Sequence, residues 1–256
     1  MIKSGYKVFP NSVSKKASIK FFNFLIKVCQ FYAPDLFEKR NYKGMWRDKD
    51  FNKKLILLRK KNKKIFSAIY NSIVKSSILY NFCYENKLDL VASKFLQTNK
   101  DFLTVRNLML RMDVPNDKRN LYGWHQDSAY DNYNTYSKNG AVIWLPLIDM
   151  TKKNGTLIVK PESQNENRVP YFKKQKGTKF LSQQLIVKNK FLKRYKTKSV
   201  NIKRNSALAT YSGLFHKSGN NNSDTVKFVF IARFNKILSK DFIHYRESYN
   251  PKFYKN

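Results

Sequence analysis

The tetrapeptide Trp124-His125-Gln126-Asp127 contains a histidine and a carboxylate two positions apart. Alternate residues of an extended strand project to the same side, so His125 and Asp127 can present an imidazole and a carboxylate to one point. A second histidine, His216, lies in a distant apolar segment that can pair near the first. Together the three side chains form the two-histidine, one-carboxylate set that holds Fe(II) and leaves coordination positions open.

The alternative interpretation is structural. A histidine two residues from an aspartate is a common pattern, and it usually marks a turn histidine that a nearby carboxylate hydrogen-bonds. The context favours the metal site, because two of the chain's three histidines lie in these two segments. The third, His244, lies in a polar C-terminal stretch, and we expect it at the surface.

Four sequence blocks follow one another in a defined order. They are Trp124-His125-Gln126-Asp127, Trp144-Leu145-Pro146-Leu147-Ile148-Asp149, Asn154-Gly155-Thr156-Leu157-Ile158-Val159-Lys160-Pro161-Glu162-Ser163 and His216-Lys217-Ser218-Gly219-Asn220, the last followed by an apolar strand. In order and spacing the blocks resemble the phytanoyl-CoA dioxygenase family over about residues 103–234. Each block alone is weak, and their combination is specific. The resemblance implies a mainly β protein, a double-stranded β-helix (jelly roll, cupin-like) with N-terminal α-helices packed on it, and a non-haem Fe(II), 2-oxoglutarate-dependent oxygenase.

The resemblance also implies roles for individual residues. Three match the family's iron ligands: His125, Asp127 and His216. Three match positions that line the cosubstrate pocket: Gln126, Trp144 and, in a looser alignment, Met109. Ser218 matches a hydroxyl that hydrogen-bonds 2-oxoglutarate.

One position departs from the family pattern. The family has an arginine on the strand after the distal histidine, which pairs with the far carboxylate of 2-oxoglutarate, and this chain has Lys227 at the matching spacing. Lysine supplies the charge without the planar two-pronged fork, so the pairing is less specific in geometry. Arg233 lies six residues further along the strand, about 20 Å away, and we expect it too far to serve the same pocket. The alternative for Lys227 is an exposed strand lysine in a lysine-rich chain.

The residue types explain the predicted chemistry. Two neutral imidazoles and one carboxylate hold a divalent iron while partly cancelling its charge, and the open positions admit a 2-oxo acid and then O2. The resemblance implies oxidative decarboxylation of 2-oxoglutarate to succinate and CO2, coupled to hydroxylation of a substrate C–H bond. A halogenating relative would lack the carboxylate, so Asp127 favours hydroxylation. The substrate stays open, because the metal and cosubstrate carry the reaction.

The length of 256 residues and the 42% hydrophobic content predict one domain with a substantial core. We expect residues 1–100 to form a helical region of that domain and residues 101–238 to form the catalytic core. Residues 165–197, lysine-rich and weakly periodic, are expected to form a variable loop that covers the substrate. Residues 239–256 are expected to form a C-terminal tail.

The formal net charge is +34, from 51 basic and 17 acidic residues. Codon bias toward lysine in an AT-rich genome explains it, and a surface that binds polyanions is the competing interpretation. Nucleic acid is not favoured, because the chain lacks zinc-finger spacing and RNA-recognition aromatic motifs and has few arginines among its cations. We expect a small-molecule or carrier-linked substrate that is anionic. The sequence does not specify the oligomeric state.

Membrane and secretion signals are not recognised. The most apolar N-terminal stretch, residues 19–32, is interrupted by polar residues, and no secretion signal precedes it. Cys29 and Cys83 are too few for a disulfide framework, and iron(II) chemistry suits a reducing interior, so we expect a cytoplasmic protein. Contact of a basic amphipathic helix with an anionic membrane surface stays open, although such a helix more often packs on its own domain.

Hydrophobic periodicity and turn residues predict the main elements. Helices are expected over residues 14–32, 48–71 and 87–96, the second as one long amphipathic helix. Strands are expected over residues 103–112, 141–147, 156–159, 184–187, 206–214 and 226–234. Asn154-Gly155 is typical of a hairpin turn, so the strands on either side are expected to form a meander.

Three functional hypotheses remain. The first and favoured one is an active iron, 2-oxoglutarate-dependent hydroxylase. The second is a catalytically retired family member that binds a ligand or partner, motivated by Lys227 in place of arginine. The third is a basic protein that binds polyanions or membrane surfaces and whose histidine positions are incidental.

Overall fold

The computed structural model describes residues 2–38, 41–74, 76–130, 138–174 and 184–242. Its centre is an antiparallel sheet of five strands in the order β1-β8-β3-β10-β2. The strands are β1 (Tyr6–Phe9), β8 (Ala207–Tyr211), β3 (Gly140–Pro146), β10 (Lys227–Lys236) and β2 (Leu103–Asp113). Strands β3 and β8 are buried along their whole length, because both faces of this sheet are covered.

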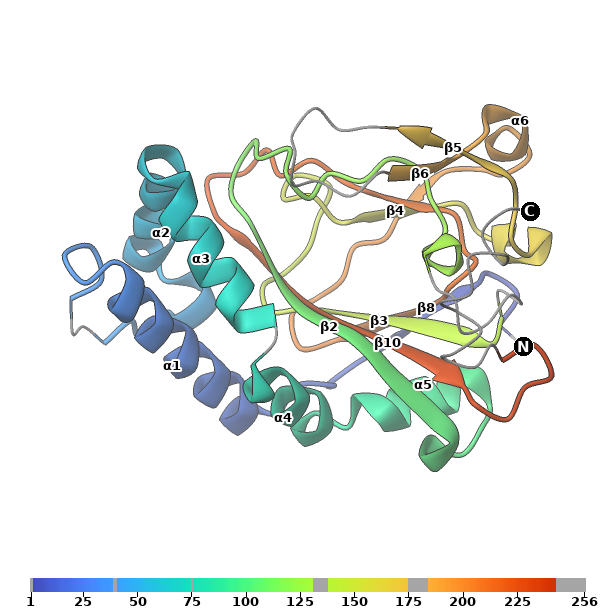
Figure 1. Ribbon diagram of the computed structural model, residues 1–256, viewed down its shortest axis with the longest axis horizontal. Coiled ribbons are helices and arrows are strands. Elements are labelled where there is room, and N and C mark those ends of the chain that lie inside the picture. The colour runs from blue at the N-terminus through green and yellow to red at the C-terminus, as the bar shows by residue number, and fades with distance from the viewer. Residues whose placement is uncertain (1, 39–40, 75, 131–137, 175–183, 243–256) are drawn as a thin grey trace.

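A smaller sheet covers one of those faces (Figure 1). It contains β7 (Lys198–Ser199), β4 (Leu157–Val159) and β9 (His216–Ser218), in that order, and a separate pair is formed by β5 (Tyr171–Lys174) and β6 (Gln184–Val187). From β3 onward the chain alternates between the two main sheets, since β4 and β9 lie in the small sheet while β8 and β10 lie in the large one. The architecture is the double-stranded β-helix that the sequence predicted.

Helices cover the opposite face of the large sheet (Figure 1). They are α1 (Lys15–Tyr32), α2 (Lys49–Lys61), α3 (Lys63–Val74), α4 (Ser77–Glu85) and α5 (Leu88–Leu96), and the short α6 (Asn189–Leu192) lies near the β5-β6 pair. The 3-10 turns are Met45–Arg47, Lys100–Phe102, Asp127–Ala129 and Ser163–Glu166.

Strand β10 separates the helical core from the inner face by simple alternation. Phe228 and Phe230 point toward the helices, where Phe230 packs 5.0 Å from Phe82 and Phe228 packs 5.2 Å from Trp46, measured between ring centroids. Successive strand residues project to opposite faces, so the odd-numbered residues of β10 point toward the small sheet. The strand thus anchors the helices with one set of side chains and supplies the site with the other.

Most predicted elements agree with the structure to within a few residues, and two expectations were wrong. The single helix expected over residues 48–71 is two helices, because the chain turns at Asn62, whose side chain accepts a hydrogen bond from the backbone of Ile65 as α3 begins. The hairpin expected at Asn154-Gly155 does not form. Gly155 does adopt a left-handed turn (φ +85°), but the turn carries the chain from the large sheet to the small one.

The N-terminal region contributes more than helices, since β1 adds an edge strand to the large sheet beside β8. The expected variable loop contains β5, β6 and α6 among its described residues. Most of the expected tail, His244 included, lies outside the described residues. None of the helices among the described residues is long and apolar enough to cross a bilayer.

A buried asparagine joins the helical layer to the sheet. The Asn52 side chain on α2 is 2% exposed; its amide nitrogen donates to the carbonyls of Trp46 and Asp48, and its oxygen accepts from the backbone nitrogen of Val226. Three backbone groups from two segments therefore depend on one side chain.

We expect Asn52→Ala to lower the free energy of unfolding by about 1–3 kcal/mol, because the substitution leaves buried backbone groups without partners. Urea unfolding followed by circular dichroism measures the loss. Lys53→Ala, one residue along on the exposed surface of α2, is the matched control and should change the midpoint little. Equal losses in the two variants would contradict the role assigned to Asn52.

Candidate metal centre

Backbone pairing brings the two predicted histidine ligands together. His125 and His216 exchange both of their backbone hydrogen bonds, at 2.9 and 3.0 Å, and form an antiparallel bridge that extends the small sheet beyond β9. Residues directly opposite each other in an antiparallel pair project to the same face. The two imidazole rings accordingly lie with their centroids 4.1 Å apart.

The same local geometry selects one nitrogen of each ring. The Nδ1 atom of His125 lies 2.7 Å from the carbonyl oxygen of Gly123, and that of His216 lies 2.9 Å from the carbonyl oxygen of Leu214. A carbonyl oxygen can only accept, so Nδ1 carries the proton in both rings and Nε2 keeps its lone pair. A carbonyl behind the ring is a usual support for a metal-binding imidazole.

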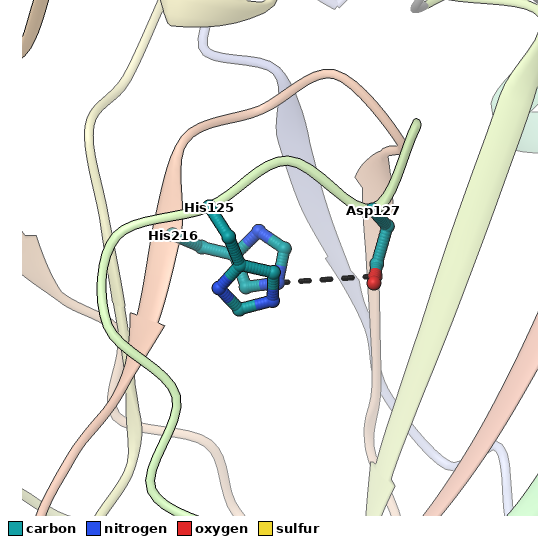
Figure 2. Close-up of side chains that lie close together, drawn as sticks. All are labelled: His125, Asp127 and His216. Atoms are coloured by element: carbon teal, nitrogen blue, oxygen red, sulfur yellow. Dashed lines mark ion pairs between the residues drawn. The ribbon is translucent and has the colours of Figure 1, made fainter. Parts of the chain in front are cut away.

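The carboxylate of Asp127 completes the group (Figure 2). Asp127 begins the 3-10 turn after the bridge, and its Oδ2 atom lies 3.8 Å from Nε2 of His216. One ligand atom from each of His125, Asp127 and His216 lies within 4.8 Å of the others, and all three residues are buried. The sequence predicted this convergence, and the structure shows it.

The protonation states suit a cation. Burial, together with the neighbouring His216, lowers the pKa of His125 to about 3, so its imidazole is neutral at pH 7. Burial opposes ionisation of Asp127, but the Arg233 guanidinium and the two histidines more than offset it and lower the pKa of Asp127 to about 2. A neutral His125 and an ionised Asp127 are the forms that bind Fe(II).

The three ligands line a cavity of about 270 Å³ between the two sheets. Three further predicted residues line it: Met109 on β2, Trp144 on β3 and Ser218 on β9. Gln126 is not among the lining residues. Its side chain turns away and hydrogen-bonds the backbone of Asn167, Val169 and Gly213, so its position supports the loop and not the predicted contact with a cosubstrate.

Lys227 does not line the cavity either. It is 2% exposed, and its Nζ lies 2.7 Å from Oδ2 of Asp113, the residue directly opposite it on β2. Burial and the nearby Arg111 together lower the pKa of Lys227 to about 8, although Asp113 opposes both. The alternative of an exposed strand lysine was wrong, because Lys227 is buried, and a buried ammonium group needs a counter-ion, which Asp113 supplies. The pairing of Lys227 with 2-oxoglutarate stays a prediction, which this position does not favour.

A different cation faces the cavity at this end. Arg111 on β2 lines it, with Nη2 2.7 Å from Asp113 and 2.6 Å from the carbonyl of Asn120, and with Nη1 3.3 Å from the Ser218 hydroxyl. Burial by itself would raise the pKa of the Asp113 carboxyl, but Arg111 and Lys227 hold it well below its usual range. Asp113 thus holds two cations in place, and only Arg111 reaches the cavity.

Two buried N–H groups in the lining have no acceptor in the described part of the chain: Nε of Arg111 and Nε1 of Trp144. An unpaired buried donor is costly, and it marks a place where a ligand oxygen is favourable. A dicarboxylate in the cavity would supply such oxygens. The cavity residues therefore fit 2-oxoglutarate as well as the metal.

Arg233 was expected to lie too far along the strand to bind the same 2-oxoglutarate carboxylate as Lys227, and that expectation stays a prediction. Arg233 lines the cavity, and its Nη2 lies 3.1 Å from Oδ1 of Asp127. The cavity extends along the inner face of β10, where Ile231 and Arg233 line it. Lys227, from which the distance to Arg233 was counted, is buried and does not line the cavity. The sequence patterns also missed Arg111. Its signal was strand parity, since Arg111 lies two residues from Met109 on the same face of β2.

Solved structures of similar fold support the architecture. The epimerase SnoN from nogalamycin biosynthesis, described as non-heme and alpha-ketoglutarate dependent, is 11% identical with a TM-score of 0.58; the match covers 91% of this chain and 78% of SnoN. EvdO2 from Micromonospora carbonacea var. aurantiaca is 16% identical with a TM-score of 0.55, covering 91% and 87%. AviO1 from Streptomyces viridochromogenes Tue57 is 13% identical with a TM-score of 0.53, covering 94% of each chain. At these identities the likeness shows a shared fold.

The family assignment comes from the sequence itself. No curated protein sequence matches the chain. The sequence pattern described as phytanoyl-CoA dioxygenase (PhyH) matches residues 32–229, more than half of the chain, and the matched region contains all three clustered ligands, His125, Asp127 and His216. The chain belongs to the phytanoyl-CoA dioxygenase family.

Proposed function

We propose that the protein is an Fe(II), 2-oxoglutarate-dependent oxygenase that hydroxylates an aliphatic C–H bond of a small or carrier-linked metabolite. The observation that carries the proposal is the buried cluster of His125, Asp127 and His216, with both Nε2 atoms available and the carboxylate ionised. Family membership supports the same chemistry.

Each ligand has a defined part in holding the metal. His125 and His216 would bind iron through Nε2, while the carbonyls of Gly123 and Leu214 fix the orientation of the rings. Asp127 would bind through its carboxylate, whose Oδ1 is already held by Arg233. Asp127 keeps the carboxylate position that a halogenating enzyme leaves free for halide, so we favour hydroxylation.

The far carboxylate of 2-oxoglutarate would bind at the end of the cavity formed by Arg111 and Ser218. Arg111 is held by Asp113 and by the Asn120 carbonyl, so its guanidinium is fixed before any ligand arrives. A fixed guanidinium pairs with a carboxylate at little cost in side-chain entropy. In this proposal Arg111 takes the part that the family gives to an arginine on the strand after the distal histidine, and Lys227 neutralises Asp113.

With both cofactors bound, O2 would oxidise 2-oxoglutarate to succinate and CO2, and its second oxygen atom would enter the substrate C–H bond. The protein orients the bound molecules and excludes water from the site. Apolar side chains such as Leu108, Ile231 and Val142 line the cavity beside the ligand cluster and exclude water from it. SnoN and a second similar structure, the carbocyclase SnoK, carry other reaction names, so hydroxylation of this substrate belongs to the proposal.

The alternatives are less well supported. The retired family member was suggested by Lys227 in place of arginine on β10, and Arg111 removes that reason because it offers a guanidinium from the neighbouring strand. A purely polyanion-binding or membrane-binding protein does not explain a buried cluster of three ligands. We place the enzyme in the cytoplasm, since ferrous chemistry and the two free buried thiols, Cys29 and Cys83, suit a reducing compartment.

Iron and cosubstrate binding test the proposal directly. Under anaerobic conditions, Fe(II) and 2-oxoglutarate added to the purified protein should give the weak visible charge-transfer band of a chelated 2-oxo acid. His216→Ala should abolish it, because one imidazole ligand is lost, and Asp127→Ala should abolish succinate formation in air. His244→Ala removes the remaining histidine and is the control. A wild-type protein that binds iron without giving the band would refute the proposal.

The cosubstrate anchor has its own test. We expect Arg111→Gln to weaken 2-oxoglutarate binding by roughly 10- to 100-fold, the effect of about 1.5–3 kcal/mol for a hydrogen-bonded charge, while iron still binds. Anaerobic titration of the visible band gives the dissociation constant. Lys227→Gln is the comparison: it should lower stability with a smaller effect on 2-oxoglutarate affinity. The reverse order of effects would return the anchor to Lys227.

A further inference from the structure

The cavity has a guanidinium group at each end. Val229, Ile231 and Arg233 project from the same face of β10, and the strand register places Arg111 opposite Val229. Arg233 lies four residues after Val229, so the two arginines enter the cavity about 13 Å apart along the strand. The proposed cosubstrate site uses the Arg111 end. The Arg233 end lies beside Asp127 and is left for another molecule.

Arg233 has unused donors. Among the described residues, Arg233 donates one hydrogen bond, from Nη2 to Asp127. A guanidinium offers five N–H groups in a planar fork. Its side chain is 20% exposed, so the remaining donors are accessible to a ligand. Arg111 differs, because its Nη1 and Nη2 atoms already donate to Ser218, Asp113 and the Asn120 carbonyl.

The charge balance favours an anion there. Bound Fe(II) and the two cavity guanidinium groups carry more positive charge than Asp127 and a dianionic 2-oxoglutarate can cancel, while Lys227 and Asp113 neutralise each other.

The side chains that line the cavity near Arg233 indicate the chemistry of the rest of the ligand. The lining near Arg233 contains the aliphatic side chains of Leu108, Val142 and Ile231, with polar groups from Asn107 and Thr210. Thr210, Val142 and Arg233 lie side by side across β8, β3 and β10 in the sheet register. A molecule that combines one negative group with a hydrocarbon part matches both features.

We propose that Arg233 binds an anionic group of the substrate, a carboxylate or a phosphate ester, and thereby places an adjacent aliphatic carbon over the metal. The inference rests on the proposed function and specifies its substrate class. Because the guanidinium also contacts Asp127, the substrate anion and the iron ligand share one cation, so substrate binding is coupled to the orientation of Asp127.

Paramagnetic relaxation tests the proposal without knowledge of the substrate. The protein is loaded with Mn(II), which substitutes for Fe(II) without redox turnover, and saturated with 2-oxoglutarate. Inorganic phosphate and acetate are then titrated separately, and the relaxation of ³¹P and of the acetate ¹³C reports binding close to the metal. Both probes are measured with metal and cosubstrate at saturation, so a change in metal affinity does not alter the probe signal. The metal affinity of each variant is measured separately.

We expect the wild type to relax at least one probe, and Arg233→Gln to weaken that binding about tenfold or more, as for loss of a charge-assisted contact. Arg233→Lys should keep part of the affinity, because the charge remains and the fork is lost. Lys203→Gln removes the same charge from an exposed loop and should bind the probe like the wild type. The stronger probe identifies the substrate group as a phosphate ester or a carboxylate.

Other outcomes would overturn the inference. Equal probe relaxation in wild type and Arg233→Gln would place the anion elsewhere. No relaxation of either probe, with Mn(II) and 2-oxoglutarate bound, would leave Arg233 as a residue that only orients Asp127. Failure of the wild type to bind Mn(II) at all would remove the proposed function and this inference together. Water-proton relaxation of the same samples measures Mn(II) binding, so this outcome is distinguished from loss of the anion site alone.

Discussion

The site depends on one pair of reciprocal backbone hydrogen bonds, those between His125 and His216. The pair joins segments that are far apart in the sequence, fixes their register and sets both imidazoles on the same face. A shift of one residue in either segment would turn one ring to the other face of the sheet. The carbonyls that hold the two Nδ1 atoms come from the same two segments, so ligand spacing and ring orientation have a single structural cause.

The large sheet transmits this arrangement to the rest of the molecule. Alternation along β10 gives phenylalanines to the helical layer and cavity residues to the inner face, so the helices stabilise the strand from its outer side. One helix also reaches the site, since Tyr70 and Val74 of α3 line the cavity. The helical layer is tied to the start of β10 by Asn52. A chain of ordinary contacts thus connects the N-terminal helices to the strand that carries Arg233.

Local patterns predicted the features that depend on local sequence. The ligands were predictable because the His-X-Asp pattern and a second apolar histidine segment leave few arrangements, although Asp127 begins a 3-10 turn and does not lie on a strand. The strand limits followed from apolar runs between turn residues. Features that depend on strand register were not. How β2 pairs with β10 places Lys227 opposite Asp113 and Val229 opposite Arg111. The sequence carries no signal for that register. Gln126 illustrates another limit, because its two neighbours belong to the ligand cluster while its own side chain points into the loop.

The shared carboxylate of Asp113 has a consequence for how such sites diverge. Two cations on adjacent strands touch the same acid, and only one of them reaches the cavity. An anion site built this way is defined by a place in space and not by a column in an alignment, because either strand can supply the guanidinium while the other neutralises the acid. Under the proposed anchoring by Arg111, two proteins of this fold would hold the same dicarboxylate with basic residues on different strands.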